Sequence, residues 1–238
     1  MNNDWVNKKT ALIGTEKEEE KVSEYRFRVI LPKEEDLAKS EYNIEELGNE
    51  VLYDMCKKYQ SHTVREQIYS KLWLIGRSYS AALERNKSEE KSEDIYRKTI
   101  DELIKIESSL DDKIQGLQPI VDYDTMCAAL DVHKDIVDIF RKTTKMEKRS
   151  LASKYLHFHR RDVFYIYDGY ANTSLMNCVK GPVLSANQYD SEYYKFCIKA
   201  LALKTKIKEK YKKDLCPREI DNLLIYLHKN NFLLSVTL

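Results

Sequence analysis

Apolar residues recur at the three- and four-residue spacing of a helix along most of this chain. Between Ile44 and Tyr59 they share one predicted face, Leu47, Val51, Met55 and Tyr59. Between Val64 and Arg85 they share another, Ile68, Leu72, Ile75, Tyr79 and Ala82. A third charged amphipathic helix is predicted from Ser88 to Leu110, with Ile95, Ile100, Leu103 and Ile106 on its apolar side. This periodicity is typical of helices that pack against a core.

Shorter helices are predicted in the second half of the chain, over 122–130, 133–142, 150–157, 168–179, 186–211 and 217–229. Ser150 and Asp168 stand where helix N-caps are expected. Pro217 suits the first position of the last helix. One short extended segment, Tyr25 to Leu31, ends at Pro32. With only six Gly and four Pro in 238 residues, the chain is expected to be all-α.

Residues 1–24 are polar and charged and predict an N-terminal tail, which leaves 25–238 as one folded domain. We find no apolar run long enough to cross a membrane and no apolar segment like that of a signal peptide. A cytoplasmic location is therefore expected. The five cysteines are scattered and form no CxxC pair, which predicts reduced thiols. No metal or cofactor is expected.

Positive charge is concentrated in two stretches of an almost neutral chain. Arg141–Arg161 and Lys195–Lys213 each hold eight Lys or Arg and one Glu, although the formal net charge of the whole chain is +1. Such polarisation is typical of a face that binds a polyanion. The alternative is that these are two solvated helix faces.

The segment from Ser150 to Asp168 holds the most chemistry. Asp168 closes the apolar run Val163–Tyr167 and is expected to cap a helix, where its carboxylate stays ionised. There it could stabilise an oxocarbenium ion or activate a water. Lys154 is expected in the first turn of its helix, where the helix dipole and apolar neighbours lower an amine's pKa. A lowered pKa suits an amine that forms a Schiff base, and the alternative is a phosphate-binding or solvent-exposed lysine.

Two further groups of polar residues accompany this segment. His157 and His159 precede Arg160 and Arg161; no third metal ligand is evident, which favours contacts to a DNA backbone or core hydrogen bonds. Trp73, Arg77 and Glu84 are expected to share a helix face, which predicts either the lining of a cleft between lobes or an intramolecular ion pair.

The pattern S-x-x-S-K-x-L-H-F-x-x-x-x-x-F-x-I-Y-D over 150–168 resembles the lysine-to-aspartate core of the helix–hairpin–helix DNA glycosylases. It is most similar to a bacterial branch that resembles 8-oxoguanine glycosylases. The stretches 73–85 and Pro217–Leu224 are similar to the same branch, so the resemblance extends over most of 60–230. It departs from the family in two places: Arg149–Ser153 has no glycine, and the interval from Lys154 to Asp168 is shorter than in eukaryotic members.

This resemblance implies two helical lobes with a base-accepting cleft between them. Asp168 would be the catalytic aspartate and Lys154 the lyase lysine. The hairpin near 146–153 would grip a phosphate. The residues expected to contact DNA are Arg149, Ser150, Ser153, Arg160 and Arg161, and those expected in the base pocket are Arg77, Tyr79 and His157. The base would be flipped out of double-stranded DNA to be reached.

The sequence therefore predicts a monomeric DNA glycosylase that leaves an abasic site. Bacterial relatives of this kind include anti-phage enzymes, so modified bases of phage DNA are among the candidate substrates. Whether a lyase step follows stays open. The main alternative is a helical module that binds nucleic acid without catalysis. A helical ribonuclease toxin fits less well because seven residues separate Arg149 from His157. A structural interaction protein would leave the basic stretches unexplained.

Overall fold

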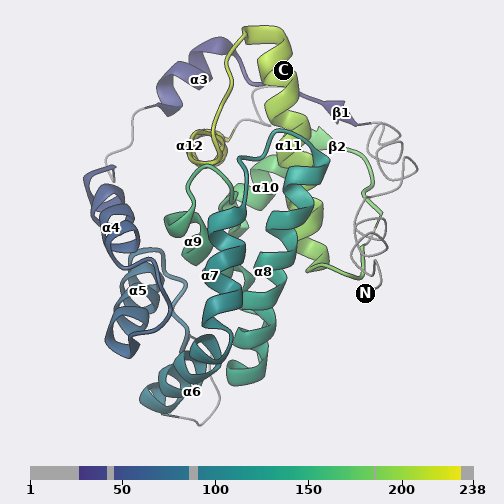
Figure 1. Ribbon diagram of the computed structural model, residues 1–238. Helices are drawn as coiled ribbons and strands as arrows, with labels where there is room; N and C mark the ends of the chain where they lie inside the picture. The colour runs from purple at the N-terminus through teal and green to yellow at the C-terminus, as the bar shows by residue number, and fades with distance from the viewer. Residues whose placement is uncertain (1–26, 42–45, 86–90, 185, 232–238) are drawn as a thin grey trace.

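A computed structural model describes residues 27–41, 46–85, 91–184 and 186–231. Within these ranges the chain is mostly helical (Figure 1), as its periodicity predicts. The helices are α3 Glu34–Ser40, α4 Glu46–Lys58, α5 Arg65–Ser78, α6 Ser92–Lys105, α7 Glu107–Gly116, α8 Tyr123–Thr144, α9 Arg149–His159, α10 Gly169–Cys178, α11 Ser191–Tyr211 and α12 Pro217–Lys229. None of them is long and apolar enough to cross a membrane. The predicted tail, 1–24, lies outside the described residues.

Two short strands form the one sheet of the described ranges. Strand β1, Arg28–Val29, pairs antiparallel with β2, Val179–Lys180, so that Arg28 lies opposite Lys180. Ile30 continues the contact by donating its backbone N–H to the carbonyl of Cys178 at 2.7 Å. The predicted extended segment is thus confirmed at Arg28–Val29, where it lies beside the end of α10.

Several predicted helix boundaries were wrong. The segments 122–130 and 133–142 form a single helix, α8, because Asp131 and Val132 between them satisfy helical geometry without a break. The helix predicted from Val64 to Arg85 ends at Ser78, and the next one is split into α6 and α7 at Ile106. Two local predictions were right, since Asp168 caps α10 and Pro217 begins α12, but Ser150 is not a cap because α9 begins one residue earlier, at Arg149, with Lys148 as its N-cap.

Helix α4 turns a different face to the core than its pattern predicts. Leu47 is 81% exposed and Val51 61% exposed, whereas Leu52, Tyr53 and Cys56 are buried. Both faces carry apolar residues at helical spacing, so periodicity alone does not choose between them. The outcome matters for the site because the buried face carries Tyr53.

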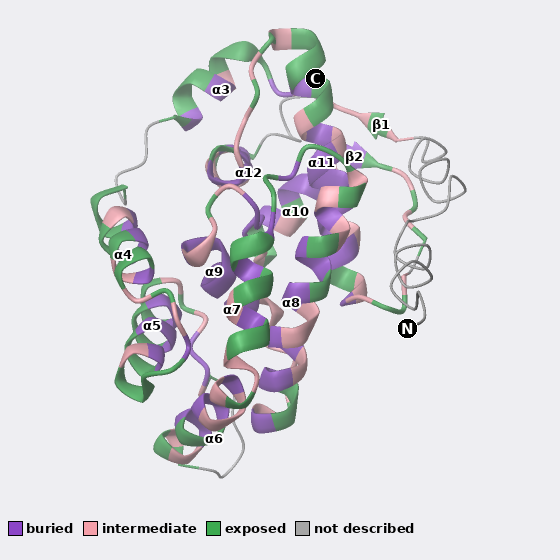
Figure 2. Cartoon of the chain, viewed as in Figure 1, coloured by how far each residue is buried: buried purple, intermediate pink, exposed green. Residues whose placement is uncertain are grey.

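Helix α9 is the centre of the molecule. Eight consecutive residues, Leu151 to Phe158, are buried, and Figure 2 draws this helix almost entirely in the colour of buried residues. Helices α4, α5 and α8 pack against it. A helix that is buried all round must satisfy its polar side chains internally. The partners of those side chains form the candidate site.

Helix α12 closes the core against α10 and α3. Its buried face carries Ile220, Leu223, Leu224 and Leu227. Two charged residues, Arg218 and Asp221, are buried on the same helix. Charged side chains are rarely buried without partners, and both of these contribute to the candidate site.

Candidate active site

Lys154 and Asp168 form an ion pair in the interior of the protein. Lys154 Nζ lies 3.4 Å from Asp168 Oδ2 and donates a hydrogen bond to Ser150 Oγ at 2.9 Å. The lysine side chain is only 2% exposed, and the aspartate side chain 26%. The other carboxylate oxygen, Oδ1, accepts the backbone N–H of Ala171 at 2.9 Å and so caps α10. The two oxygens of Asp168 therefore have separate tasks.

Ser153 fixes the distance between these two residues. Its hydroxyl accepts the backbone N–H of Tyr167 at 3.0 Å, across fourteen positions of the chain. This bond ties α9 to the residue just before Asp168. Ser153 is fully buried, so its role in the structure is to position the site, whereas the sequence predicts a DNA contact.

Burial sets the electrostatics of Lys154. The loss of hydration lowers the pKa of its amine, Asp168 and Asp221 oppose that shift, and Arg218 adds to it. The prediction that Lys154 lies in the first turn of its helix was wrong. The helix begins at Arg149 with Lys148 as its N-cap, which puts Lys154 in the second turn, where the helix dipole acts less.

Tyr79, predicted to lie in the base pocket, lies against the amine. Lys154 Nζ is 5.6 Å from the centre of the Tyr79 ring, a cation–π distance. The Tyr79 hydroxyl donates to Asn49 Oδ1 at 2.5 Å. The structure therefore brings together Lys154, Asp168 and Tyr79 from three separate segments.

Arg218 and Asp221 belong to this cluster and were assigned no role from the sequence. Arg218 Nη1 donates to Asp221 Oδ2 at 3.1 Å, and Nε donates to the Tyr53 hydroxyl at 2.9 Å. The guanidinium lies within 6 Å of three ring centres, those of Tyr53, Tyr79 and Phe158. One signal could have found the pair: an Arg and an Asp three positions apart on the apolar face of a helix imply an internal ion pair.

His157, the second residue predicted in the base pocket, is a buried structural residue. Its Nδ1 lies 2.7 Å from the carbonyl oxygen of Phe164, which can only accept. Nδ1 therefore carries the proton, and Nε2 accepts from the Tyr53 hydroxyl at 2.6 Å. Burial holds the pKa of His157 well below its usual value. The ring is neutral and all of its hydrogen bonds lie inside the protein.

Arg77, the third predicted pocket residue, lies elsewhere. It forms an ion pair with Glu84 and lies over the ring of Trp73, 5.9 Å from its centre. The intramolecular ion pair, one of the two alternatives, is thus present, although Glu84 lies beyond the end of α5 and so does not share a helix face with Arg77. The pair also lines an open cavity of about 450 Å³, whose lining includes neither Lys154 nor Asp168.

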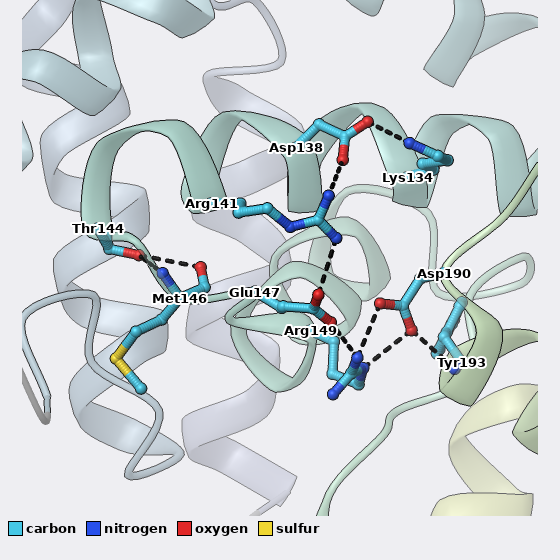
Figure 3. A network of polar contacts seen from close by, with 9 residues as sticks. All are labelled: Lys134, Asp138, Arg141, Thr144, Met146, Glu147, Arg149, Asp190 and Tyr193. Atoms are coloured by element: carbon cyan, nitrogen blue, oxygen red, sulfur yellow. Dashed lines mark hydrogen bonds and ion pairs between the residues drawn. The ribbon is translucent and has the colours of Figure 1, made fainter.

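The hairpin between α8 and α9 has no glycine but adopts backbone angles that glycine favours. Lys145 (φ 62°) and Lys148 (φ 48°) both lie in the left-handed region. Thr144 stabilises the turn by accepting the backbone N–H of Met146 at 3.1 Å (Figure 3). Lys148 then begins α9 without any side-chain cap. The chain thus builds a tight helix–turn–helix just before Lys154.

Arg149 and Ser150, expected to contact DNA from this hairpin, have internal partners. Arg149 holds Asp190 at two points, Nε to Oδ1 at 2.8 Å and Nη2 to Oδ2 at 3.0 Å, and also pairs with Glu147 (Figure 3). Ser150 accepts the hydrogen bond from Lys154. Their side chains stabilise the start of α9 and its contact with α11.

Arg160 and Arg161 differ sharply although they are neighbours. Arg160 donates to the carbonyl oxygens of Ile114 and Leu117, both at 2.8 Å, and so caps the end of α7. The Arg161 side chain is 59% exposed, lies over the Tyr53 ring and reaches Glu50 at 3.5 Å. Of the five predicted DNA contacts, Arg161 is the most accessible.

Comparison with family models, curated proteins and solved structures found no match.

Several Lys and Arg side chains of the two basic stretches form ion pairs with acidic residues that lie outside these stretches. Such pairs join Arg141 to Asp138, Lys142 to Glu102, Arg149 to Asp190, Arg161 to Glu50, Lys204 to Asp214 and Lys213 to Glu41. The sum of charges along a stretch therefore overstates the positive field that its surface presents. Among the described residues no group of three His, Cys, Asp or Glu side chains could hold a metal ion.

Proposed function

We propose that this chain is a DNA glycosylase that cleaves the N-glycosidic bond of a modified or damaged base and leaves an abasic site. The supporting observation is the pair of Lys154 and Asp168, 3.4 Å apart, directly after a tight helical hairpin. An amine and a carboxylate at one point are the groups that this reaction needs. The resemblance of 150–168 to the glycosylase core supports the same proposal.

Asp168 would act on the sugar. Departure of the base leaves positive charge on C1′ and the ring oxygen, and an ionised carboxylate held beside them lowers the energy of that transition state. The bond from Ala171 fixes the carboxylate through Oδ1, so that Oδ2, which already pairs with Lys154, is the oxygen that would act on the sugar or an attacking water. Little reorganisation is then required during the reaction.

Lys154 would have one of two roles in the reaction, depending on its protonation state. As an ammonium it balances the charge of Asp168, and as a neutral amine it can attack C1′ directly. Tyr79 offers an aromatic face beside the amine on which an extruded base could stack. Modified bases in phage DNA belong among the substrates to be tested.

One observation favours a second candidate, a helical module that binds nucleic acid without catalysis. Lys154 is almost fully buried and already paired, as a purely structural lysine would be. Both candidates predict DNA binding that weakens with salt. Only a glycosylase produces abasic sites.

The test is abasic-site formation on duplexes with oxidised, alkylated or glucosylated bases and on phage genomic DNA. The wild-type protein is compared with Asp168→Asn, which keeps a cap-forming side chain. Release of a base by the wild type and its loss in the variant would support the proposal. Binding without abasic sites on every substrate would support the binding module, and full activity of the variant would refute the role of Asp168.

A further inference from the structure

Two cations from different helices share the ring of Tyr79. Lys154 Nζ of α9 lies 5.6 Å from the ring centre, and Arg218 Cζ of α12 lies 5.9 Å from it. Like charges this close in a buried site repel each other unless carboxylates compensate them. The arrangement of those carboxylates therefore decides how each cation behaves.

Arg218 is held in place from several sides. Asp221 binds Nη1 at 3.1 Å and the Tyr53 hydroxyl accepts from Nε at 2.9 Å. Tyr53 is fixed in turn by its hydrogen bond to His157 on α9. Both side chains of the Arg218–Asp221 pair are only 8% exposed, so water screens this pair little.

Charged and polar groups from three other segments act on Lys154. Asp168 approaches from the start of α10, Arg218 and Asp221 from α12, and Tyr79 from the end of α5, while Ser150 lies on its own helix. Asp221 acts on the amine in the same direction as Asp168, and Arg218 acts in the opposite direction. By binding Asp221, Arg218 also weakens the pull of that carboxylate on Lys154.

We infer that Arg218 and Asp221 are positioning residues that set the charge state of Lys154, with Arg218 favouring the neutral amine and Asp221 the ammonium. This rests on the proposed function, because it concerns the amine of the same site. It assigns the two residues opposite effects on one reaction, Schiff-base formation by Lys154 at an abasic sugar.

The reaction can be isolated from base removal by supplying the abasic site ready-made. The neutral amine adds to the aldehyde carbon C1′ of the ring-opened sugar, the aldehyde oxygen leaves as water, and an imine remains. Cyanoborohydride then donates a hydride to the imine carbon, and a proton from water completes a stable secondary amine. An ammonium has no lone pair and cannot begin this sequence.

The experiment measures the rate of trapping by cyanoborohydride on a duplex with one abasic site, from pH 5.5 to 9. Wild type is compared with Arg218→Met, Arg218→Lys and Asp221→Asn. Lys154→Ala must abolish the adduct, which shows that Lys154 forms it. Arg97→Met, in the exposed pair with Asp94 on α6 and outside both basic stretches, is the control that leaves the profile unchanged.

We expect the midpoint of the pH profile to rise in Arg218→Met and to fall in Asp221→Asn. Trapping below the midpoint changes about tenfold for each pH unit of displacement. Arg218→Lys, which keeps a cation beside Asp221, should restore much of the wild-type profile. Loss of a purely structural pair would instead change both variants in the same direction.

Three outcomes would overturn the inference: unshifted midpoints, shifts of the same sign, or no trapping by the wild-type protein. If Arg218→Met does not fold, the lower midpoint expected in Asp221→Asn and the pH profile of Arg218→Lys still test the inference. If the trapping experiment fails but the wild-type protein forms abasic sites and Asp168→Asn does not, the proposed function is retained. Conversely, trapping with the predicted shifts but no base release on any substrate would count against the proposed function alone.

Discussion

The hydroxyl of Tyr53 donates a hydrogen bond to Nε2 of His157 at 2.6 Å, although the two residues are 104 positions apart. The same hydroxyl accepts from Nε of Arg218 at 2.9 Å. One phenol oxygen thus joins α4, α9 and α12 next to the candidate site. The Phe164 carbonyl fixes the proton on Nδ1 of the histidine, so that Nε2 accepts, and the arginine guanidinium can only donate.

Tyr53→Phe should therefore destabilise the protein far more than loss of one surface hydroxyl. It leaves a buried acceptor on His157 and a buried charged donor on Arg218 without their partner, which predicts a loss of about 2–4 kcal/mol in the free energy of unfolding. Urea denaturation measures this. Tyr170→Phe, at an exposed tyrosine, is the control and should change stability by less than about 0.5 kcal/mol. Equal stability of the two variants would contradict this role of the Tyr53 hydroxyl.

Two substitutions of Asp168 should distinguish its role in catalysis from its role in stability. Asparagine is as good an N-cap as aspartate, so Asp168→Asn should preserve the bond from Ala171 while removing the charge that the reaction needs. Both variants remove the partner of Lys154, and Asp168→Ala also loses the cap, so its unfolding free energy should lie about 1 kcal/mol below that of Asp168→Asn. Thermal melting and base release are measured side by side. If both variants retained base release, Asp168 would act as a cap alone.

The burial of His133 predicts that the stability of the protein depends on pH. Burial lowers the pKa of its imidazole to about 4, even though Asp190 and the Arg149 carbonyl oppose the shift. The unfolded chain takes up a proton below its ordinary pKa, about 6.5, while the folded ring stays neutral. Its contribution to stability is thus complete above about pH 6.5 and is lost as the pH falls toward 4, in total about 3 kcal/mol.

His133→Phe checks this, because a phenyl ring can still stack on Tyr193, whose ring centre is 3.7 Å from that of His133, but cannot be protonated. Urea unfolding at pH 7.5 and pH 4.5 should show a smaller difference in the variant than in the wild type. An unchanged difference would mean that other groups, such as His157 and His62, carry the acid sensitivity.

Substitution of Arg160 should affect mainly the stability of the protein, and substitution of its neighbour Arg161 mainly its DNA binding. Arg160→Ala removes charged hydrogen bonds to the carbonyls at the end of α7 and should cost about 2–3 kcal/mol of stability. Arg161→Ala should change stability little, weaken DNA binding and reduce the dependence of log K on log salt by about one unit. Denaturation and salt titration of DNA affinity measure the two effects. The reverse pattern would exclude Arg161 as a phosphate contact.

The candidate site could be predicted from the sequence only in part. Lys154, Asp168 and Tyr79 were singled out and do meet in the structure. Arg77 does not join them, and His157 and Ser153 are near the site but act as internal hydrogen-bonding residues. Residue type indicated the chemistry, but burial and partners decided which polar groups are available to a ligand.

What the sequence by itself determined is local: the helical class, the cap of α10 at Asp168 and the start of α12 at Pro217. These features depend on residues within a few positions of each other, so short-range rules are sufficient. Only the tertiary structure decided which face of α4 is buried, which cations of the basic stretches are paired, and that Arg218 and Asp221 reach Lys154. Those relationships arise from packing between distant segments, where free energy depends on the surface and charge that all the helices bury together.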